Sequence, residues 1–370
     1  MEPFRIAVPQ QEIDDLHVRL DRARWPDELP DAGWDYGVPS AYVRELADHW
    51  RHRYDWRATE RRLNAFPQFT TEIDGQRVHF LHVRSARADA LPLILTHGWP
   101  GSVAEFLDVI EPLARDFHLV VPSLPGFGFS GPTTSRGWNV PRIARAWAEL
   151  MRRLGYRRYG SAGNDWGSAV APEVGRVAPE AVTGVHVTQL WAEPTGAPGE
   201  LDDPTPEERA ALDGAAWFAA NMDAYQRVQR QQPQSLAYAL ADSPIGLLAW
   251  HCVIYRGGVD ADFVLDNVMM HWLTGTAGSA MRIYREDTLT PRHTTPATTP
   301  IGVAQFAEDY MPVRRLVARE HSDVRSWHVY DRPGHFAAHQ SPDLLVTDIR
   351  DFFAALDPAG EVLRGASSVR

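Results

Sequence analysis

The sequence contains a single cysteine, Cys252, so no disulfide can form within the chain. A chain without disulfides is typical of a reducing compartment, and we expect a cytoplasmic location. No apolar run approaches the roughly 18 residues that cross a bilayer. The first residues, Met1–Ile6, lack the basic-then-apolar pattern of a signal peptide. We therefore expect no membrane anchor.

Excess positive charge is also missing. The 48 acidic residues outnumber the 37 lysines and arginines, and the formal net charge is −11. This balance argues against nucleic acid or an anionic membrane as a partner. No convincing metal-ligand cluster or phosphate-binding glycine loop is visible, so we expect no metal and no cofactor. What is abundant is tryptophan, with 13 residues that could fill the core or line an apolar cavity.

The pattern of apolar residues divides the chain into four segments. Residues 1–75 are predicted to form amphipathic helices that lead into a hairpin. In residues 76–192, short buried strands alternate with helices, which predicts an α/β fold with a mostly parallel, doubly wound sheet. Residues 193–295 show helical patterns almost without strand signals, which indicates an inserted helical cap. Residues 296–370 return to the sheet with two strands and a closing helix.

The central motif is Gly163-Asn164-Asp165-Trp166-Gly167, between a predicted strand and a predicted helix. Such a sharp turn projects its middle side chain into a pocket and aims the next backbone N–H at developing negative charge. Serine is common at this place, but here the residue is Asp165. A carboxylate can displace a leaving group at an sp3 carbon, which predicts a substrate with a strained oxygen or a halide on carbon. The motif alone leaves an N-capping Asp in an ordinary loop equally open.

A second motif, Thr96-His-Gly-Trp-Pro-Gly101, directly follows the strand Leu93–Leu95. A turn of this composition can expose the backbone N–H of Trp99 toward the pocket. Together with the N–H of Trp166, it predicts a two-donor oxyanion hole. We interpret His97 as structural, since a histidine that holds a loop is commoner than a second catalytic base.

The predicted base is His335 in Asp331-Arg-Pro-Gly-His-Phe336, which follows the last predicted strand. A tight glycine turn there could face the carboxyl edge of the sheet, where His335 would activate water against an ester. His339 and His328 are the alternatives, but His328 alternates with apolar neighbours inside the strand.

An acid that orients this histidine should lie between the last two strands, following the order nucleophile, acid, histidine. Glu308 and Asp309 both lie just after the strand Ile301–Ala304, and the spacing alone allows either. Asp323 and Asp331 are weaker alternatives.

With these residues in view, the chain resembles the microsomal-type epoxide hydrolases from about Phe4 to Leu356. The resemblance implies an α/β-hydrolase fold with a helical cap and an amino-terminal helical extension. It rests on three segments: His97-Gly-Trp-Pro-Gly-Ser102, Gly163-Asn-Asp-Trp-Gly-Ser168 and Gly334-His-Phe-Ala-Ala338.

The resemblance also implies further site residues. The family carries its acid on the fourth residue of a Phe-Pro-x-(Asp/Glu) segment, so Phe306-Ala-Glu-Asp309 favours Asp309. Two cap tyrosines hydrogen-bond the epoxide oxygen in the family, and the matching segments here give Tyr225 and Tyr284. The sequence departs from the family at Ala307, at Pro333 and at His339-Gln340.

We therefore expect an epoxide hydrolase that forms an alkyl ester on Asp165 and hydrolyses it with water activated by His335. The expected partner is a small hydrophobic epoxide, and a homodimer is compatible with the amino-terminal helices. The alternative enzyme is a haloalkane-type dehalogenase with the same nucleophile. A catalytically silent binding protein is the alternative from another class.

Overall fold

The computed structural model describes residues 1–256, 258–291 and 293–356. The described strands form one nine-stranded sheet in the order β1-β2-β3-β5-β4-β6-β7-β8-β9. The pairs from β5 to β9 across the sheet are parallel, whereas β1, β2, β3 and β5 pair antiparallel. The predicted, mostly parallel α/β sheet is confirmed. The strands are β1 (Glu2–Phe4), β2 (Gln68–Ile73), β3 (Gln76–Val83), β4 (Leu91–Thr96), β5 (Phe117–Pro122), β6 (Tyr159–Gly163), β7 (Val182–Val187), β8 (Ile301–Ala307) and β9 (Val324–Pro333).

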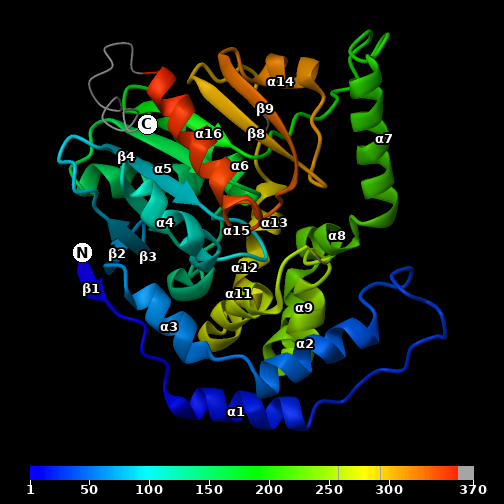
Figure 1. Cartoon of the computed structure of the whole chain (residues 1–370). Coiled ribbons are helices and arrows are strands. Elements are labelled where there is room, and N and C mark those ends of the chain that lie inside the picture. Colours follow the sequence, from blue (N-terminus) through cyan, green and yellow to red (C-terminus); the bar gives the residue numbers. More distant parts are fainter. Residues whose placement is uncertain (257, 292, 357–370) are drawn as a thin grey trace, which may run out of the picture.

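Helices cover both faces of the sheet (Figure 1). On one face α4 (Leu107–Leu113) packs against α16 (Pro342–Ala355), and on the other α5 (Val140–Arg153) packs against α6 (Trp166–Val177). The buried strand β4 shows how its residues serve both layers. Leu93 and Leu95 belong to the core beneath α4 and α16, whereas Ile94 belongs to the core beneath α5 and α6. Because its residues alternate between the two cores, β4 is fixed in its register within the sheet. In such parallel sheets, functional residues lie at the carboxyl ends of the strands.

The helical cap follows β7, as the pattern predicts. Its amino-terminal helix, α7, extends away from the rest of the protein in Figure 1. The cap also bonds to the core, where Ser102 donates to Asn267 at 2.8 Å and Gly128 N–H donates to Thr276 at 3.1 Å. The cap helices are α7 (Pro206–Asn221), α8 (Ala224–Gln231), α9 (Pro233–Asp242), α10 (Pro244–His251), α11 (Ala261–Thr274), α12 (Ala277–Ala280) and α13 (Arg282–Asp287).

The amino-terminal helices α1 (Gln10–Asp21), α2 (Ser40–His52) and α3 (Trp56–Asn64) pack against α10 and α11 of the cap. Trp50 donates its indole N–H to Met269 at 3.2 Å, and the Tyr54 hydroxyl donates to Asp266 at 2.7 Å. The amino-terminal segment therefore braces the cap from outside. The four predicted domain bounds remain predictions.

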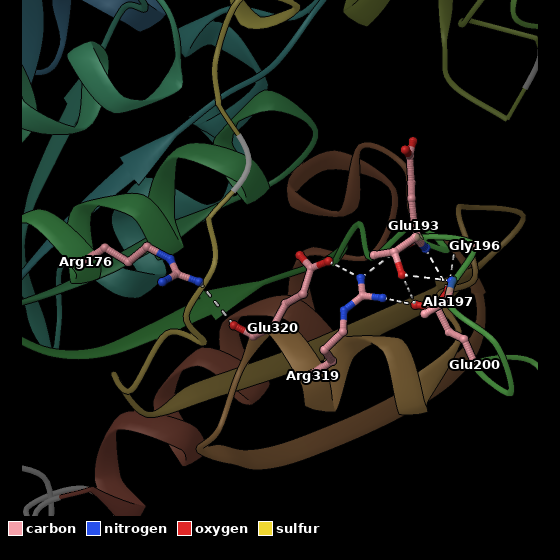
Figure 2. A network of polar contacts seen from close by, with 8 residues as sticks. Arg176, Glu193, Gly196, Ala197, Glu200, Arg319 and Glu320 are labelled. Atoms are coloured by element: carbon pink, nitrogen blue, oxygen red, sulfur yellow. Dashed lines mark hydrogen bonds and ion pairs between the residues drawn. The ribbon is translucent and has the colours of Figure 1, made fainter.

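The chain enters the cap through residues 193–205, and α14 (Arg314–Glu320) holds this segment in place (Figure 2). Arg319 bonds to the carboxylate of Glu200 and to the backbone oxygen of Glu193. One turn earlier, Arg315 donates to the backbone oxygen of Asp202 at 2.8 Å.

Neither α14 nor β1 was among the predicted elements. In the described part of the chain, no helix has both the length and the apolar character to cross a membrane.

Candidate active site

Asp165 lies at a strained turn between β6 and α6. Its backbone has φ +46° and ψ −127°, a conformation that non-glycine residues rarely adopt. The turn brings the chain very close to β4. A Cβ on Gly167 would lie 1.8 Å from the backbone oxygen of Thr96, so the turn is possible only because Gly167 has no side chain. The glycine in the motif is therefore required by close approach, and the turn holds the Asp165 side chain at the end of the sheet.

Two backbone N–H groups face the Asp165 carboxylate. The N–H of Trp99 donates to its Oδ1 at 2.7 Å. Burial raises the pKa of Asp165, while the positive charge of His335 and the N–H groups of Trp99 and Trp166 act in the opposite direction. The structure thus brings together the nucleophile and the two donors that the sequence motifs indicate.

The loop after β9 carries His335 to the same place. Its Nδ1 lies 3.0 Å from Oδ1 of Asp309, which follows β8, and its Nε2 is buried without a partner among the described residues. The other predicted acid, Glu308, is exposed. Of the two neighbouring carboxylates, the structure therefore places Asp309 beside the histidine.

The charge around His335 is strongly negative. Burial alone would lower the pKa of His335, but the carboxylates of Asp309, Asp165 and Glu105 outweigh it and raise the pKa to about 9. At neutral pH the free protein therefore holds an imidazolium between two carboxylates. That charge depends on Asp165 remaining ionised.

The two predicted cap tyrosines both lie over this centre, Tyr225 on α8 and Tyr284 on α13. The Tyr225 ring stacks on Trp99 with centroids 5.3 Å apart, and the Tyr284 ring meets Trp166 edge-on at 4.8 Å. Burial raises the pKa of both phenols, and the nearby Asp165 raises it further. Both hydroxyls are therefore protonated donors at neutral pH.

The remaining histidines of the sequence motifs lie outside this centre. His97 accepts the Leu124 N–H at 3.1 Å through Nε2, and its Nδ1 lies 3.0 Å from the backbone oxygen of Gly98, so it holds the loop. Burial lowers the pKa of His97 to about 3, which keeps it neutral. His328 bonds to Asp348, and His339 bonds to Asp108 and Asp260.

Two polar residues of the centre escaped the sequence analysis. Gln189, just beyond β7, donates its amide N–H to Asp309 at 2.6 and 2.7 Å. Glu105 is buried and acts electrostatically on both Asp165 and His335. A signal for Glu105 exists in the sequence, because the apolar residues Val109 and Leu113 follow it at α-helical spacing, although in the structure a short 3-10 helix before α4 carries Glu105.

Comparisons with known proteins agree with this geometry. Residues 1–106 match the family model described as the epoxide hydrolase N terminus, and residues 92–241 match that of the alpha/beta hydrolase fold. A candidate epoxide hydrolase of Stigmatella aurantiaca is 41% identical over 96% of this chain and 85% of its own. Epoxide hydrolase 1 of Sus scrofa is 30% identical over 96% of this chain and 89% of its own. The solved epoxide hydrolase of Aspergillus niger matches with a TM-score of 0.87 and 32% identity, over 96% of both chains.

The sheet, the strained elbow and the family match define an enzyme of the α/β-hydrolase fold. The match of residues 1–106 and the similarity over 96% of the chain identify one family within this class. The chain belongs to the epoxide hydrolases that carry an amino-terminal epoxide hydrolase segment.

Proposed function

We propose that this chain converts an epoxide and water to a vicinal diol through a covalent ester on Asp165. The observation that supports the proposal most directly is the setting of that carboxylate. Its Oδ1 accepts the Trp99 N–H at 2.7 Å, and the Tyr225 and Tyr284 rings contact the two residues of the oxyanion hole. Opening an epoxide needs attack at carbon and a proton for oxygen, and these groups supply both.

In the first half-reaction, a carboxylate oxygen of Asp165 bonds to an epoxide carbon and the C–O bond of the ring breaks. The departing alkoxide takes a hydroxyl proton from Tyr225 or Tyr284, which leaves a phenolate. His335 is an imidazolium at this stage, because the nearby carboxylates raise its pKa to about 9 despite its burial. Its proton returns to the phenolate, so the step ends with neutral tyrosines and a neutral imidazole.

In the second half-reaction, the ester removes the negative charge of Asp165, one of the charges that raise the pKa of His335. The neutral imidazole, oriented by Asp309, takes a proton from water as the water oxygen bonds to the ester carbon. The N–H groups of Trp99 and Trp166 stabilise the resulting oxyanion. The bond to the alkyl oxygen then breaks, His335 returns the proton to that oxygen, and the diol leaves. The proton that the water left on the Asp165 carboxyl group passes to His335, which restores the carboxylate and the imidazolium.

The aromatic rings around Asp165 favour a small hydrophobic epoxide as substrate. Trp99 and the two tyrosines are almost completely buried, and their rings contact one another. An apolar epoxide could pack against these rings at little cost, whereas an ionic substrate would lose its hydration there without compensation. The acidic chain also supports the proposal that neither nucleic acid nor a membrane is a partner.

The experiment that tests the proposal traps the ester. The variant His335→Gln, mixed with styrene oxide, should gain the mass of one epoxide on the peptide that holds Asp165. Asp165→Asn should gain none. Release of halide from alkyl halides without diol from epoxides would support the dehalogenase instead. Styrene oxide that binds reversibly and is recovered unchanged would support a binding protein.

A further inference from the structure

Glu105 is a buried acid that the two half-reactions leave unused. It lies in the short 3-10 helix Val103–Phe106, which leads into α4, and its side chain is only 1% exposed. Charged residues are rarely buried to this degree unless they are paired or functional. The Asn164 side chain and the Gly98 N–H lie close enough to stabilise the charged form of Glu105, but neither carboxyl oxygen has a partner in full hydrogen-bonding geometry among the described residues.

The loop of the oxyanion hole places Glu105 beside the nucleophile. A Cβ on Gly101 would lie 2.1 Å from Oε2 of Glu105, and a Cβ on Gly98 would lie 2.1 Å from Oδ1 of Asp165. Two glycines of one loop therefore make room for two carboxyl groups. Between them is Trp99, whose N–H contacts Asp165. Glu105 and Asp165 thus flank the loop that would hold the oxyanion.

Other buried polar atoms around Glu105 also lack partners. Both side-chain amide atoms of Asn164, which precedes the nucleophile, and Nε2 of His335 have none among the described residues. Asp165 and His335 act electrostatically on Glu105, and the Asn164 side chain faces it as a hydrogen-bond donor. Buried polar atoms are nearly always hydrogen-bonded in folded proteins, and a cluster of unpaired ones marks a place where a polar molecule binds.

We propose that Glu105, together with the amide of Asn164, holds the water molecule that hydrolyses the Asp165 ester. The inference rests on the proposed function and assigns a place to its second reactant. Water at this place donates one proton to Nε2 of His335 and its other hydrogen bond to a Glu105 oxygen. A lone pair then faces the ester carbon. After the new C–O bond forms, the proton on His335 goes to the departing diol oxygen.

The ionisation of Glu105 suits this role. Burial, helped by the charge of Asp165, raises the pKa of Glu105 to about 8, although Asn164, His335 and the Gly98 N–H act in the opposite direction. At pH 7, below this pKa, the protonated form of Glu105 predominates, with one oxygen that accepts and one hydroxyl that donates, and the negative charges that face His335 are then those of Asp309 and Asp165. A neutral acid can orient water without placing a second anion beside the nucleophile.

Single-turnover rapid-quench kinetics of the full chain with styrene oxide test the proposal, because they separate ester formation from ester hydrolysis. Glu105→Leu should form the ester within about threefold of the wild-type rate and hydrolyse it about 100-fold more slowly, since misplaced reactants cost about that factor. Glu105→Gln keeps a donor and an acceptor and should hydrolyse within about tenfold of wild type. The matched control is Glu111→Gln, an exposed acid on α4, which should match wild type in both steps.

Several outcomes would overturn the proposal. Hydrolysis at the wild-type rate in Glu105→Leu would do so, and so would an equal loss in ester formation, which would place Glu105 in the first step. If Glu105→Leu does not fold, Asn164→Ala carries the same prediction of slow hydrolysis after normal ester formation. If the wild-type chain forms no ester at all, the result would contradict the proposed function itself rather than the role of Glu105.

Discussion

Nδ1 of His335 lies 3.0 Å from Oδ1 of Asp309, while the adjacent Glu308 is exposed. The difference arises where β8 ends, because Glu308 adopts φ +63°, in the left-handed region. This turn sends the two neighbouring carboxylates in different directions. Gln189 then fixes the inner one by donating to both oxygens of Asp309. Backbone conformation therefore selects the acid that two adjacent residues could equally supply.

Asp309→Asn should slow ester hydrolysis by about 10² to 10⁴, because an amide cannot stabilise the imidazolium that forms as water is deprotonated. The ester should accumulate during turnover and be visible by mass spectrometry. Glu308→Gln, the matched control, should retain wild-type kinetics. Loss of hydrolysis in Glu308→Gln but not in Asp309→Asn would show that the acid is assigned to the wrong residue.

Tyr225→Phe and Tyr284→Phe should each slow ester formation by about 10², since each removes a donor to the developing alkoxide. Ester hydrolysis should stay close to the wild-type rate, because the proposed second half-reaction uses neither phenol. Pre-steady-state kinetics with styrene oxide measure both rates. Tyr238→Phe, a tyrosine of the cap that is 72% exposed, is the control. A tyrosine variant that slows only hydrolysis would contradict the assignment.

The ionisation of His335 should follow the charge on Asp165. In the free enzyme burial would lower the pKa of His335, but the surrounding carboxylates raise it to about 9. Asp165→Asn carries a neutral amide like the ester, so the pKa of His335 should fall in this variant. Histidine ¹⁵N NMR across a pH titration measures the change. An unchanged pKa would mean that the ester does not prepare the base for the second step.

His339 joins the cap to the core from the segment that follows His335. Its Nδ1 lies 2.8 Å from Asp108 on α4, and its Nε2 lies 2.8 Å from Asp260 at the start of α11. Its ring stacks on Phe263 with centroids 4.1 Å apart. Burial lowers the pKa of His339, but Asp108 and Asp260 outweigh burial and raise it above the usual 6.5. His339 at this position therefore links the cap to the core through two carboxylates that favour its protonated form.

His339→Leu should lower the free energy of unfolding by about 1 kcal/mol or less, because both ion pairs are partly exposed and screened. A raised folded-state pKa stabilises fully below the unfolded value of about 6.5, and this contribution is lost as pH rises through the folded-state pKa. The deficit should therefore be larger at pH 6 than at pH 9.5 in urea unfolding. His52→Leu, whose side chain is 59% exposed, is the control. A deficit that does not change with pH would point to lost packing alone.

The core of the fold was predictable because its signals are local. Leu93, Ile94 and Leu95 form a short apolar run whose residues are all buried, as expected for a parallel strand with helices on both faces. The elbow was predictable for a similar reason, since its motif is contiguous in the sequence, even though Gly167 is required by a contact with Thr96 on the distant strand β4. Strand β1 was not, because its three residues are extended only through pairing with β2.

The missed parts of the site depend on contacts between distant segments. Glu105 was not recognised because an acid near a helix start is ordinarily exposed, and its surroundings include residues distant in sequence such as Asn164 and His335. Gln189 lies 120 residues from Asp309, and nothing in its neighbours indicates that their side chains meet. The family resemblance favoured Asp309, but the spacing alone could not choose between Glu308 and Asp309, because the choice depends on a backbone angle at Glu308 that no residue type there prescribes.

The covalent ester on Asp165 is tested most directly by one turnover of styrene oxide in ¹⁸O-labelled water, with enzyme in excess. The mechanism predicts that the first diol is unlabelled and that the label enters the Asp165 carboxylate, because water attacks the ester carbon. Mass spectrometry of the diol and of the peptide that holds Asp165 measures both. Label in the first-turnover diol, with none in Asp165, would contradict the covalent mechanism and indicate direct attack of water on the epoxide.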